Sequence, residues 1–185
     1  MSANKFYDAY FNSINKAIQS LDYSLLEKIS ILIRSCKDRG KKLIIVGNGG
    51  SAAISSHVAV DFTKVAKIRA INFNEAGLIT CFANDYGYEN WVTEALKAYA
   101  DRDDMVILIS SSGESLNLVN AAKTAKKLGL TVVTLTGFLS SNKLREAGDI
   151  NLWVDSESYN EIETAHQTWL LALVDYAIKS NSAKN

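Results

Sequence analysis

Two short segments of this 185-residue chain carry residues suited to binding an anion. The first reads Gly-Asn-Gly-Gly-Ser over residues 47–51 and follows the apolar run 44–46. The second reads Ser-Ser-Ser-Gly-Glu-Ser over residues 110–115 and follows the apolar run 106–109. Glycine lets backbone N–H groups approach a ligand closely, a helix N-terminus offers unpaired donors, and serine hydroxyls add neutral donors. The two segments therefore indicate a site for a phosphorylated ligand.

The glycine-rich segment also satisfies G-x-G-x-x-A, the first half of the dinucleotide-binding fingerprint. The fingerprint needs a carboxylate at the end of the second strand to hold a ribose hydroxyl. Here the run 69–74 holds no carboxylate, and the first one is Glu75. A nicotinamide enzyme is therefore disfavoured. A tight strand-to-helix turn without a ligand stays open for this segment alone, but the four hydroxyls of the serine-rich segment exceed what helix capping needs.

Glu114 is the discordant residue of the serine-rich segment, since a carboxylate beside a phosphate would repel it. If the segment binds phosphate, we expect this side chain to point away, toward solvent or a neighbouring subunit. The orientation of Glu114 therefore checks the anion-binding interpretation.

Two further pairs of residues have a spacing that suits either chemistry or helix stability. His57 and Asp61 lie four residues apart in a predicted helix and share a face of it, as an i,i+4 ion pair also would. Asn160 and Glu163 resemble a capping box at the start of the last predicted helix. The spacing alone leaves both interpretations open.

The elements that must position these residues alternate between apolar strands and helical patterns. The strands are rich in Val, Ile and Leu with little alternation, which is typical of a parallel sheet covered on both faces. We expect an α/β three-layer sandwich, in which a five-stranded parallel sheet is flanked by helices and binds ligands at the strand carboxyl ends. The expected strands are 42–46, 69–73, 105–109, 131–135 and 150–154, and the expected helices are 4–20, 23–39, 52–64, 75–83, 89–100, 115–128, 140–146 and 160–180.

Composition limits the class of protein further. A formal net charge of zero predicts no general attraction to nucleic acid or to an anionic membrane. The chain holds no apolar run long enough to span a bilayer, and its first residues lack a secretory apolar core, so we expect a cytoplasmic protein. Cys36 and Cys81 share no metal-type spacing and are predicted to be reduced thiols in the core.

The segments 47–51, 84–88 (Asn-Asp-Tyr-Gly-Tyr) and 110–115, in this order, resemble the sugar isomerase (SIS) fold and, more narrowly, the phosphoheptose isomerases. The resemblance spans nearly the whole chain. It implies one SIS domain over 1–185, with 1–40 as an N-terminal helical segment used in oligomerisation and 41–185 as the α/β core. It implies a homotetramer that interconverts sedoheptulose 7-phosphate and D-glycero-D-manno-heptose 7-phosphate through an enediol(ate), for lipopolysaccharide, capsule or another glycan.

The resemblance also assigns roles to ionisable residues. It places His57 on a metal-ligand histidine and Asp61 on the position of the catalytic glutamate. It places Glu163 where the family carries a metal-binding glutamine, and Leu171 where the family carries a second histidine. The acid–base pair of this chain therefore departs from the family pattern at two positions.

His166, one turn before the missing histidine, or Gln167, on the face of Glu163, could compensate for this departure. We expect Asp61 to transfer the proton, with Glu163 or His166 as its partner. A zinc ion held by His57, Asp61 and Glu163 is compatible with these residue types, although the sequence requires no cofactor. The expected substrate-binding residues are Asn48, Gly49, Gly50, Ser51, Asp85, Ser110, Ser111, Ser112, Ser115 and Asn160.

An alternative function remains open at this point. Some proteins of the same fold have lost the catalytic pair and act as sugar-phosphate sensors or scaffolds, and this chain also resembles the replication-initiator-associating protein in size and loops. Leu171 in place of the histidine favours this alternative. The retained His57, Asp61, Glu163 and His166 favour an enzyme, because a scaffold has no need of ionisable groups near a phosphate site.

Overall fold

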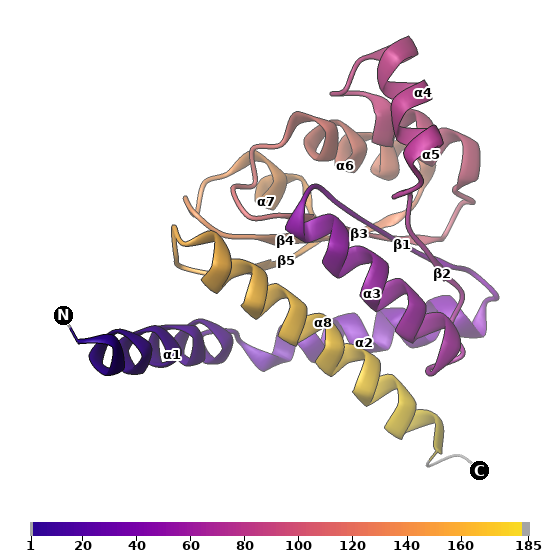
Figure 1. The fold of residues 1–185 in the computed structure, drawn as a ribbon. Helices are drawn as coiled ribbons and strands as arrows, with labels where there is room; N and C mark the ends of the chain where they lie inside the picture. The colour runs from indigo at the N-terminus through magenta and orange to yellow at the C-terminus, as the bar shows by residue number, and fades with distance from the viewer. Residues whose placement is uncertain (1, 183–185) are drawn as a thin grey trace.

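Five parallel strands form one sheet at the centre of the protein (Figure 1). In spatial order the strands are β2 (Ala70–Ile71), β1 (Leu43–Gly47), β3 (Met105–Ser110), β4 (Thr131–Thr136) and β5 (Ile150–Trp153). The computed structural model describes residues 2–182. The side chains of β1 and β3 are buried on both faces, because these strands are runs of apolar residues with no polar side to turn to solvent. The predicted parallel sheet is confirmed.

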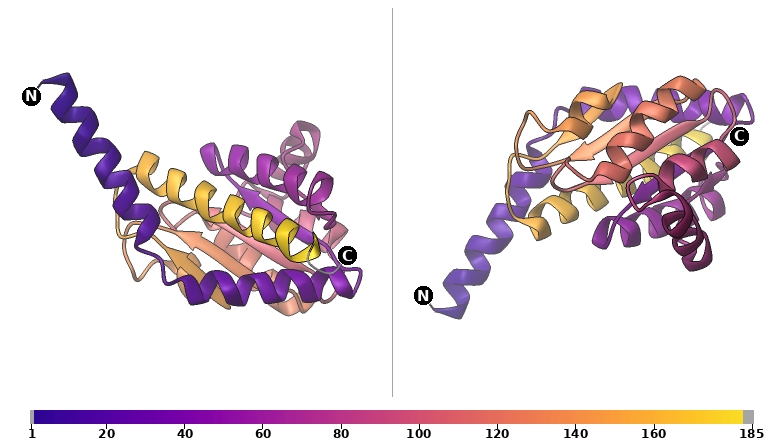
Figure 2. Two further views of the ribbon diagram at one scale, coloured as in Figure 1. Left: turned by 90° about the horizontal axis from the view of Figure 1, so that it is seen from below. Right: turned by 90° about the horizontal axis from the view of Figure 1, so that it is seen from above.

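Helices cover both faces of the sheet and complete a three-layer sandwich, as predicted (Figures 1 and 2). Alternate strand residues serve the two faces: Ile45 packs against α2, α3 and α8, whereas Ile44 and Val46 pack against α5 and α6. Within residues 2–182, none of the helices has the length and apolar character needed to cross a membrane. The helices are α1 (Ala3–Gln19), α2 (Tyr23–Asp38), α3 (Gly50–Lys64), α4 (Ala76–Tyr86), α5 (Trp91–Tyr99), α6 (Leu116–Leu128), α7 (Lys143–Ala147) and α8 (Tyr159–Ser182).

The edge strand β2 is shorter than the predicted strand 69–73. It pairs only with β1, and its two residues are half-buried. Beyond it the chain turns toward α3, where the Asn74 side-chain amide donates to the Ala52 carbonyl (2.6 Å) and to Ser56 Oγ (2.8 Å). The polar contacts with α3 thus replace ladder hydrogen bonds and end the strand early.

The first helix, α1, extends away from the body of the protein (Figure 2). Its second half is held against α8 by a hydrogen bond from Ser13 Oγ to Glu161 and by one from Trp169 Nε1 to the Ile18 carbonyl (2.8 Å). Phe6 and Phe11 are more than half exposed on the same helix. Exposed aromatic residues on a projecting helix are a feature of surfaces that meet another protein chain.

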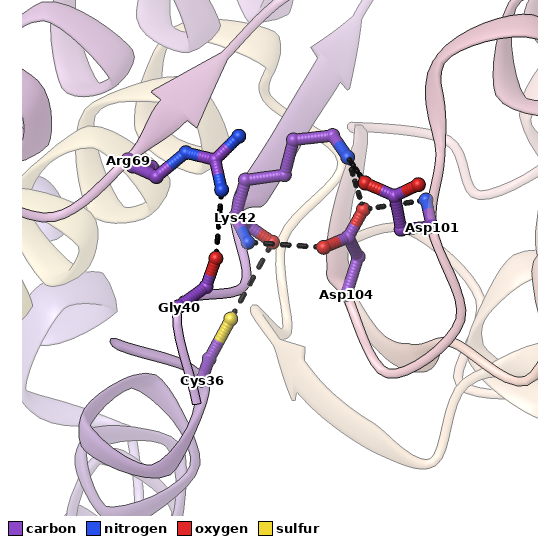
Figure 3. A network of polar contacts seen from close by, with 6 residues as sticks. All are labelled: Cys36, Gly40, Lys42, Arg69, Asp101 and Asp104. Carbon is purple, nitrogen blue, oxygen red and sulfur yellow. Dashed lines mark hydrogen bonds and ion pairs between the residues drawn. The ribbon is translucent and has the colours of Figure 1, made fainter. Parts of the chain in front are cut away.

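A buried ion pair joins β1 and β3 at the amino end of the sheet (Figure 3). Lys42 Nζ lies 2.6 Å from Asp104 Oδ2 and 2.7 Å from Asp101 Oδ2. The Lys42 backbone N–H donates to Asp104 Oδ1 (3.0 Å), and Cys36 Sγ donates to the Lys42 carbonyl (3.4 Å). Burial opposes the charged ammonium, but the two carboxylates outweigh burial and hold the pKa of Lys42 above its ordinary value.

The two cysteines have different environments. Cys36 is buried, as predicted, and burial raises the pKa of its thiol. Cys81 is exposed on α4, with Sγ 3.8 Å from the Asp85 carboxylate, so its predicted place in the core is wrong. The reason is that α4 packs one side, through Leu78 and Phe82, against its neighbour α5, and Cys81 faces away from that side.

We expect Asp104→Ala to lower the free energy of unfolding by about 3 kcal/mol, because the buried Lys42 ammonium loses one of its two carboxylates and two backbone N–H groups lose their acceptor. Chemical denaturation measures the change. The control is Lys97→Ala, which removes the exposed pair with Glu94 and should cost less than about 1 kcal/mol. Equal, small losses in both variants would show that the buried pair does not stabilise the sheet.

Candidate active site

The glycine-rich and serine-rich segments lie side by side at the carboxyl edge of the sheet. β1 and β3 are adjacent, and the register pairs Gly47 with Ile109, so the residues that follow both strands leave the sheet together. Each segment leads into a helix, α3 or α6, whose first N–H groups point toward the same edge. This is where ligands bind in open parallel sheets.

Close packing explains the glycines of the first turn. A Cβ at Gly47 would lie 2.6 Å from Ser51 Cβ and 2.7 Å from its backbone, so only glycine lets the chain fold back into α3. Gly50, the first residue of α3, lies against the Glu163 carboxylate of α8, and a Cβ at this position would displace that carboxylate. The carboxylate therefore lies at the positive end of the α3 dipole.

Asn48 is fixed by partners that the sequence analysis did not identify. Its amide and that of Asn117 exchange hydrogen bonds of 3.1 and 2.9 Å, and the Tyr88 hydroxyl donates to Asn48 Oδ1 (3.1 Å). Asn117 is buried in the first turn of α6, and Tyr88 belongs to the connection between α4 and α5. In the sequence, the one sign of a role for Asn117 is its place in the first turn of the helix that follows the serine-rich segment. Asn48 thus couples the first turn to the start of α6.

The serine hydroxyls are more than helix caps. Ser115 precedes α6 but its side chain makes no capping hydrogen bond, and Ser110 Oγ donates to Ser115 Oγ (3.2 Å) instead. Ser111 Oγ is buried and has no hydrogen-bond partner among the described residues. A buried hydroxyl without a partner is costly unless a ligand or water completes it. The geometry therefore suits an anion at this loop.

Glu114 points away from the serine hydroxyls, as expected. Its carboxylate accepts hydrogen bonds from Lys143 Nζ (2.7 Å) and from the Lys143 backbone N–H (3.1 Å) at the start of α7. The Lys143 side chain, and then its N–H, hold the pKa of Glu114 below its usual range. The Glu114 side chain is also exposed, so it faces solvent as well as Lys143.

A cavity of about 520 Å³ opens beside the first turn, between α1, α3 and α8. It brings together four of the residues expected at the site, Gly50, His57, Asn160 and Glu163, together with Gln167, and it adds Tyr10. Most of its side chains carry hydrogen-bonding groups, as a polyhydroxylated ligand requires. The lining residues are Tyr10, Gly50, Ala53, Ile54, His57, Asn160, Glu163, Thr164 and Gln167.

His57 makes polar contacts with both ring nitrogens. Nε2 lies 3.2 Å from Asp61 Oδ2, so the ion-pair geometry anticipated from the spacing does form. Nδ1 lies 3.4 Å from the Gln167 side-chain nitrogen, which can only donate, so Nδ1 accepts and Nε2 carries the proton. Asp61 is about one-third exposed behind the imidazole. Gln167 and Asp61 therefore fix the orientation and tautomer of this ring.

α8 begins at Tyr159, so Asn160 lies inside the helix and not at a cap. The Glu163 carboxylate contacts Gly50 across the helix interface. The capping-box interpretation therefore does not describe Asn160 and Glu163. Both residues instead face the cavity from the first turns of α8.

His166 lies in the core and does not line the cavity. It is fully buried, its Nε2–H donates to the Thr136 carbonyl (3.1 Å), and its Nδ1 has no partner among the described residues. Burial, only partly offset by that hydrogen bond, lowers the pKa of His166 to about 4, so the ring is neutral at pH 7. Leu171, one turn later, packs against the same apolar core.

Asp85 is separate from these residues. It is exposed at the end of α4, which projects from the sheet, and its described side-chain contacts are with Cys81 and Asn84 of its own helix (Figure 1). The structure thus brings together Asn48, Ser51 and the serine loop on one side, and His57, Asp61, Glu163 and Asn160 on the other, but does not bring Asp85 to either group.

The residues expected to hold zinc do not form a ligand set. Across residues 2–182, no group of three or more His, Cys, Asp or Glu side chains is arranged to hold a metal ion. His57 contacts Asp61 and Gln167 through its two nitrogens, while the Glu163 carboxylate packs against Gly50. These residues therefore do not fit a zinc site in this arrangement.

Known proteins resemble this chain in sequence and fold. A family profile, the SIS domain, matches residues 6–137. The chain is 31% identical to a phosphoheptose isomerase of Helicobacter pylori (strain P12), over 98% of this chain and 96% of that one. It is 35% identical to a probable phosphoheptose isomerase of Thermoplasma volcanium, over 85% and 83%. A solved phosphoheptose isomerase from Francisella tularensis superposes with a TM-score of 0.88 at 26% identity, over 97% and 100%. The chain therefore belongs to the SIS domain family and to its phosphoheptose isomerase branch.

Proposed function

We propose that the protein is a sugar-phosphate aldose–ketose isomerase that interconverts sedoheptulose 7-phosphate and D-glycero-D-manno-heptose 7-phosphate. The observation that carries the proposal is the serine loop, with its unpartnered buried Ser111 hydroxyl, together with a polar cavity lined by His57 and Glu163, where Asp61 contacts the His57 ring from outside the lining. The phosphoheptose isomerases to which the chain is similar over nearly its whole length support this substrate. The heptose phosphate would then supply lipopolysaccharide, capsule or another glycan.

In this proposal the phosphate binds at the serine loop and the sugar extends toward the cavity. Donors from side chains and from the α3 and α6 N-termini would surround the ligand and fix its position by hydrogen bonds. Asp85 belongs to the proposed set of substrate-binding residues because the segment 84–88 resembles that of the family. The proposed substrate-binding residues are Asn48, Gly49, Gly50, Ser51, Asp85, Ser110, Ser111, Ser112, Ser115 and Asn160.

The reaction moves one proton from C1 to C2 and one from the C1 hydroxyl to the C2 oxygen. A carboxylate removes the C1 proton of the ketose while an acid protonates the C2 carbonyl oxygen to give the enediol. The proton then returns from the carboxylate to C2, and the C1 hydroxyl gives its proton back to the conjugate base of the acid, which forms the aldose. We propose Asp61 and Glu163 for these transfers, with His57 orienting Asp61. His166 has no part in these transfers, because its ring is buried and donates a hydrogen bond to the Thr136 carbonyl. No metal ion takes part in the proposed steps, since His57, Asp61 and Glu163 are not arranged as ligands of one ion.

A sugar-phosphate sensor or scaffold is the second candidate. Two observations favour it: Leu171 packs in the core where the family carries a histidine, and the nearby His166 cannot take over from inside the core. Such a protein would keep the serine loop and bind the phosphate without turnover. The two candidates therefore differ in chemistry and not in ligand.

We propose that the whole chain acts as one domain, with residues 1–40 as an assembly segment and 41–185 as the α/β core. The projecting α1 carries exposed aromatic rings that support assembly into a homotetramer, the expected form for the family. We also infer a cytoplasmic location, because a doubly charged sugar phosphate does not cross a bilayer to reach an enzyme outside.

The test of the function is incubation with sedoheptulose 7-phosphate in deuterated water, followed by NMR and mass spectrometry. We expect the aldose to form with deuterium at C2, because a carboxylate base exchanges its proton with solvent. Binding of the sugar phosphate without isomer or deuterium would overturn the enzyme and leave the sensor or scaffold.

Asp61→Asn should reduce kcat by about 100-fold or more while substrate binding persists, because the variant keeps the shape and removes the base. Steady-state kinetics measure both quantities. The matched control is Asp175→Asn, the same substitution at an exposed position on a different helix, α8, and it should leave kcat unchanged. If Asp61 only pairs with His57, turnover will be intact and stability will fall by less than about 0.5 kcal/mol.

Light scattering at micromolar concentration should give the mass of a tetramer. Phe11→Glu, which places a charge on the exposed face of α1, should lower that mass without changing the far-UV circular dichroism. A monomer mass for the unmodified chain would contradict the proposed assembly.

A further inference from the structure

Glu114 brings a negative charge into the loop that is proposed to bind phosphate. It follows Gly113 directly, and its backbone N–H contacts Ser112 Oγ (3.2 Å), so its backbone is part of the loop. A carboxylate free to rotate toward a phosphate dianion would oppose binding, and the opposition is strong where water is partly excluded. The placement of this side chain therefore affects ligand affinity.

Lys143 takes up both oxygens of the Glu114 carboxylate. Nζ contacts one oxygen and the backbone N–H contacts the other, at 2.7 and 3.1 Å. Both side chains are exposed, 62% for Lys143 and 46% for Glu114, so this pair adds little to folding stability. The two-point contact nevertheless restricts the direction of the carboxylate, because the backbone donor cannot move with the lysine side chain.

The segment before α7 fixes Lys143 relative to the loop. Asn142 is buried and packs against Gly113, where no Cβ would fit. Its side-chain amide donates to the Gly137 and Leu139 carbonyls at 3.2 and 2.8 Å. The Leu144 N–H donates to the Gly113 carbonyl (2.9 Å), and the Gly137 N–H donates to the Ser111 carbonyl (2.8 Å). The loop and the start of α7 thus form one hydrogen-bonded unit.

We propose that Lys143 is a positioning residue for phosphate binding, which acts by holding the Glu114 carboxylate outside the serine loop. The inference rests on the proposed function, because it assumes a phosphorylated ligand at this loop. Lys143 does not touch the ligand in this account. Its effect passes through Glu114, and it sets the affinity for the phosphate end of the substrate rather than the rate of proton transfer.

The test is a double-mutant cycle with inorganic phosphate as the probe, by calorimetry, and KM and kcat for sedoheptulose 7-phosphate alongside. Lys143→Met removes the charge and keeps the stem, and should weaken phosphate binding and raise KM by roughly tenfold with kcat nearly unchanged. Glu114→Gln alone should change affinity by less than about twofold, because the carboxylate is already held away. The double variant should return to within about twofold of the original chain.

Two controls separate this inference from simpler explanations. Lys126→Met removes a nearby lysine that pairs with Asp149 (3.2 Å), and should leave phosphate binding unchanged. Lys143→Arg keeps the charge and should preserve affinity. Thermal melts of each variant confirm that the fold is retained.

Several outcomes would overturn the inference. If Glu114→Gln strengthens phosphate binding as much as Lys143→Met weakens it, each charge acts on the phosphate independently through the electrostatic potential, and Lys143 does not act through Glu114. If the double variant stays as weak as Lys143→Met, the lysine acts on the ligand directly or on the fold. If the original chain isomerises the sugar but Lys143→Met does so with the same KM, the inference fails and the proposed function stands. A loss of phosphate affinity that Glu114→Gln restores, in a chain without turnover, would keep the inference and remove the isomerase.

Discussion

The buried contact between Lys42 and Asp104 fixes how the two central strands align. Because Asp104 accepts both the backbone N–H and the ammonium of Lys42, β1 cannot slide along β3 without leaving a buried charge unpaired. A parallel register fixed at the amino end also sets the carboxyl end, five residues along each strand, where Gly47 lies opposite Ile109. The juxtaposition of the glycine-rich and serine-rich loops therefore depends on a charge pair at the far edge of the sheet.

The contact between α8 and the first turn sets the other half of the site. Gly50 lacks a side chain, so the Glu163 carboxylate reaches the N-terminus of α3, where the helix dipole favours a negative charge. The same approach brings Gln167 within reach of His57 on α3. Gly47 thus allows the turn into α3, and Gly50 leaves room for the Glu163 carboxylate beside that turn.

The sequence predicted the sheet, the layers and the two loops between strand and helix, because apolar runs and Gly or Ser clusters are local signals. It did not reveal Tyr10, Tyr88 or Asn117, whose positions depend on how distant segments meet. The burial of His166 was open to prediction, since it shares a helix face with Ile162, Ala165 and Trp169. His166 was instead predicted to be a catalytic partner, because it lies one turn before the position of the family histidine. Cys81 was placed wrongly because its helix is covered on only one side.

Two glutamates near the site have opposite orientations, and the difference follows from what packs around each one. Glu163 is held inward by the close approach of two helices, at a position where a carboxylate faces the cavity and the positive end of α3. Glu114 is turned outward by a lysine anchored on a neighbouring turn. The result is a site with neutral donors at one end and carboxylates at the other. In the proposed binding mode a sugar phosphate would have one favourable direction, with its phosphate at the serine loop and its reacting carbons toward Glu163 and His57, because the reverse direction would place the dianion against the carboxylates.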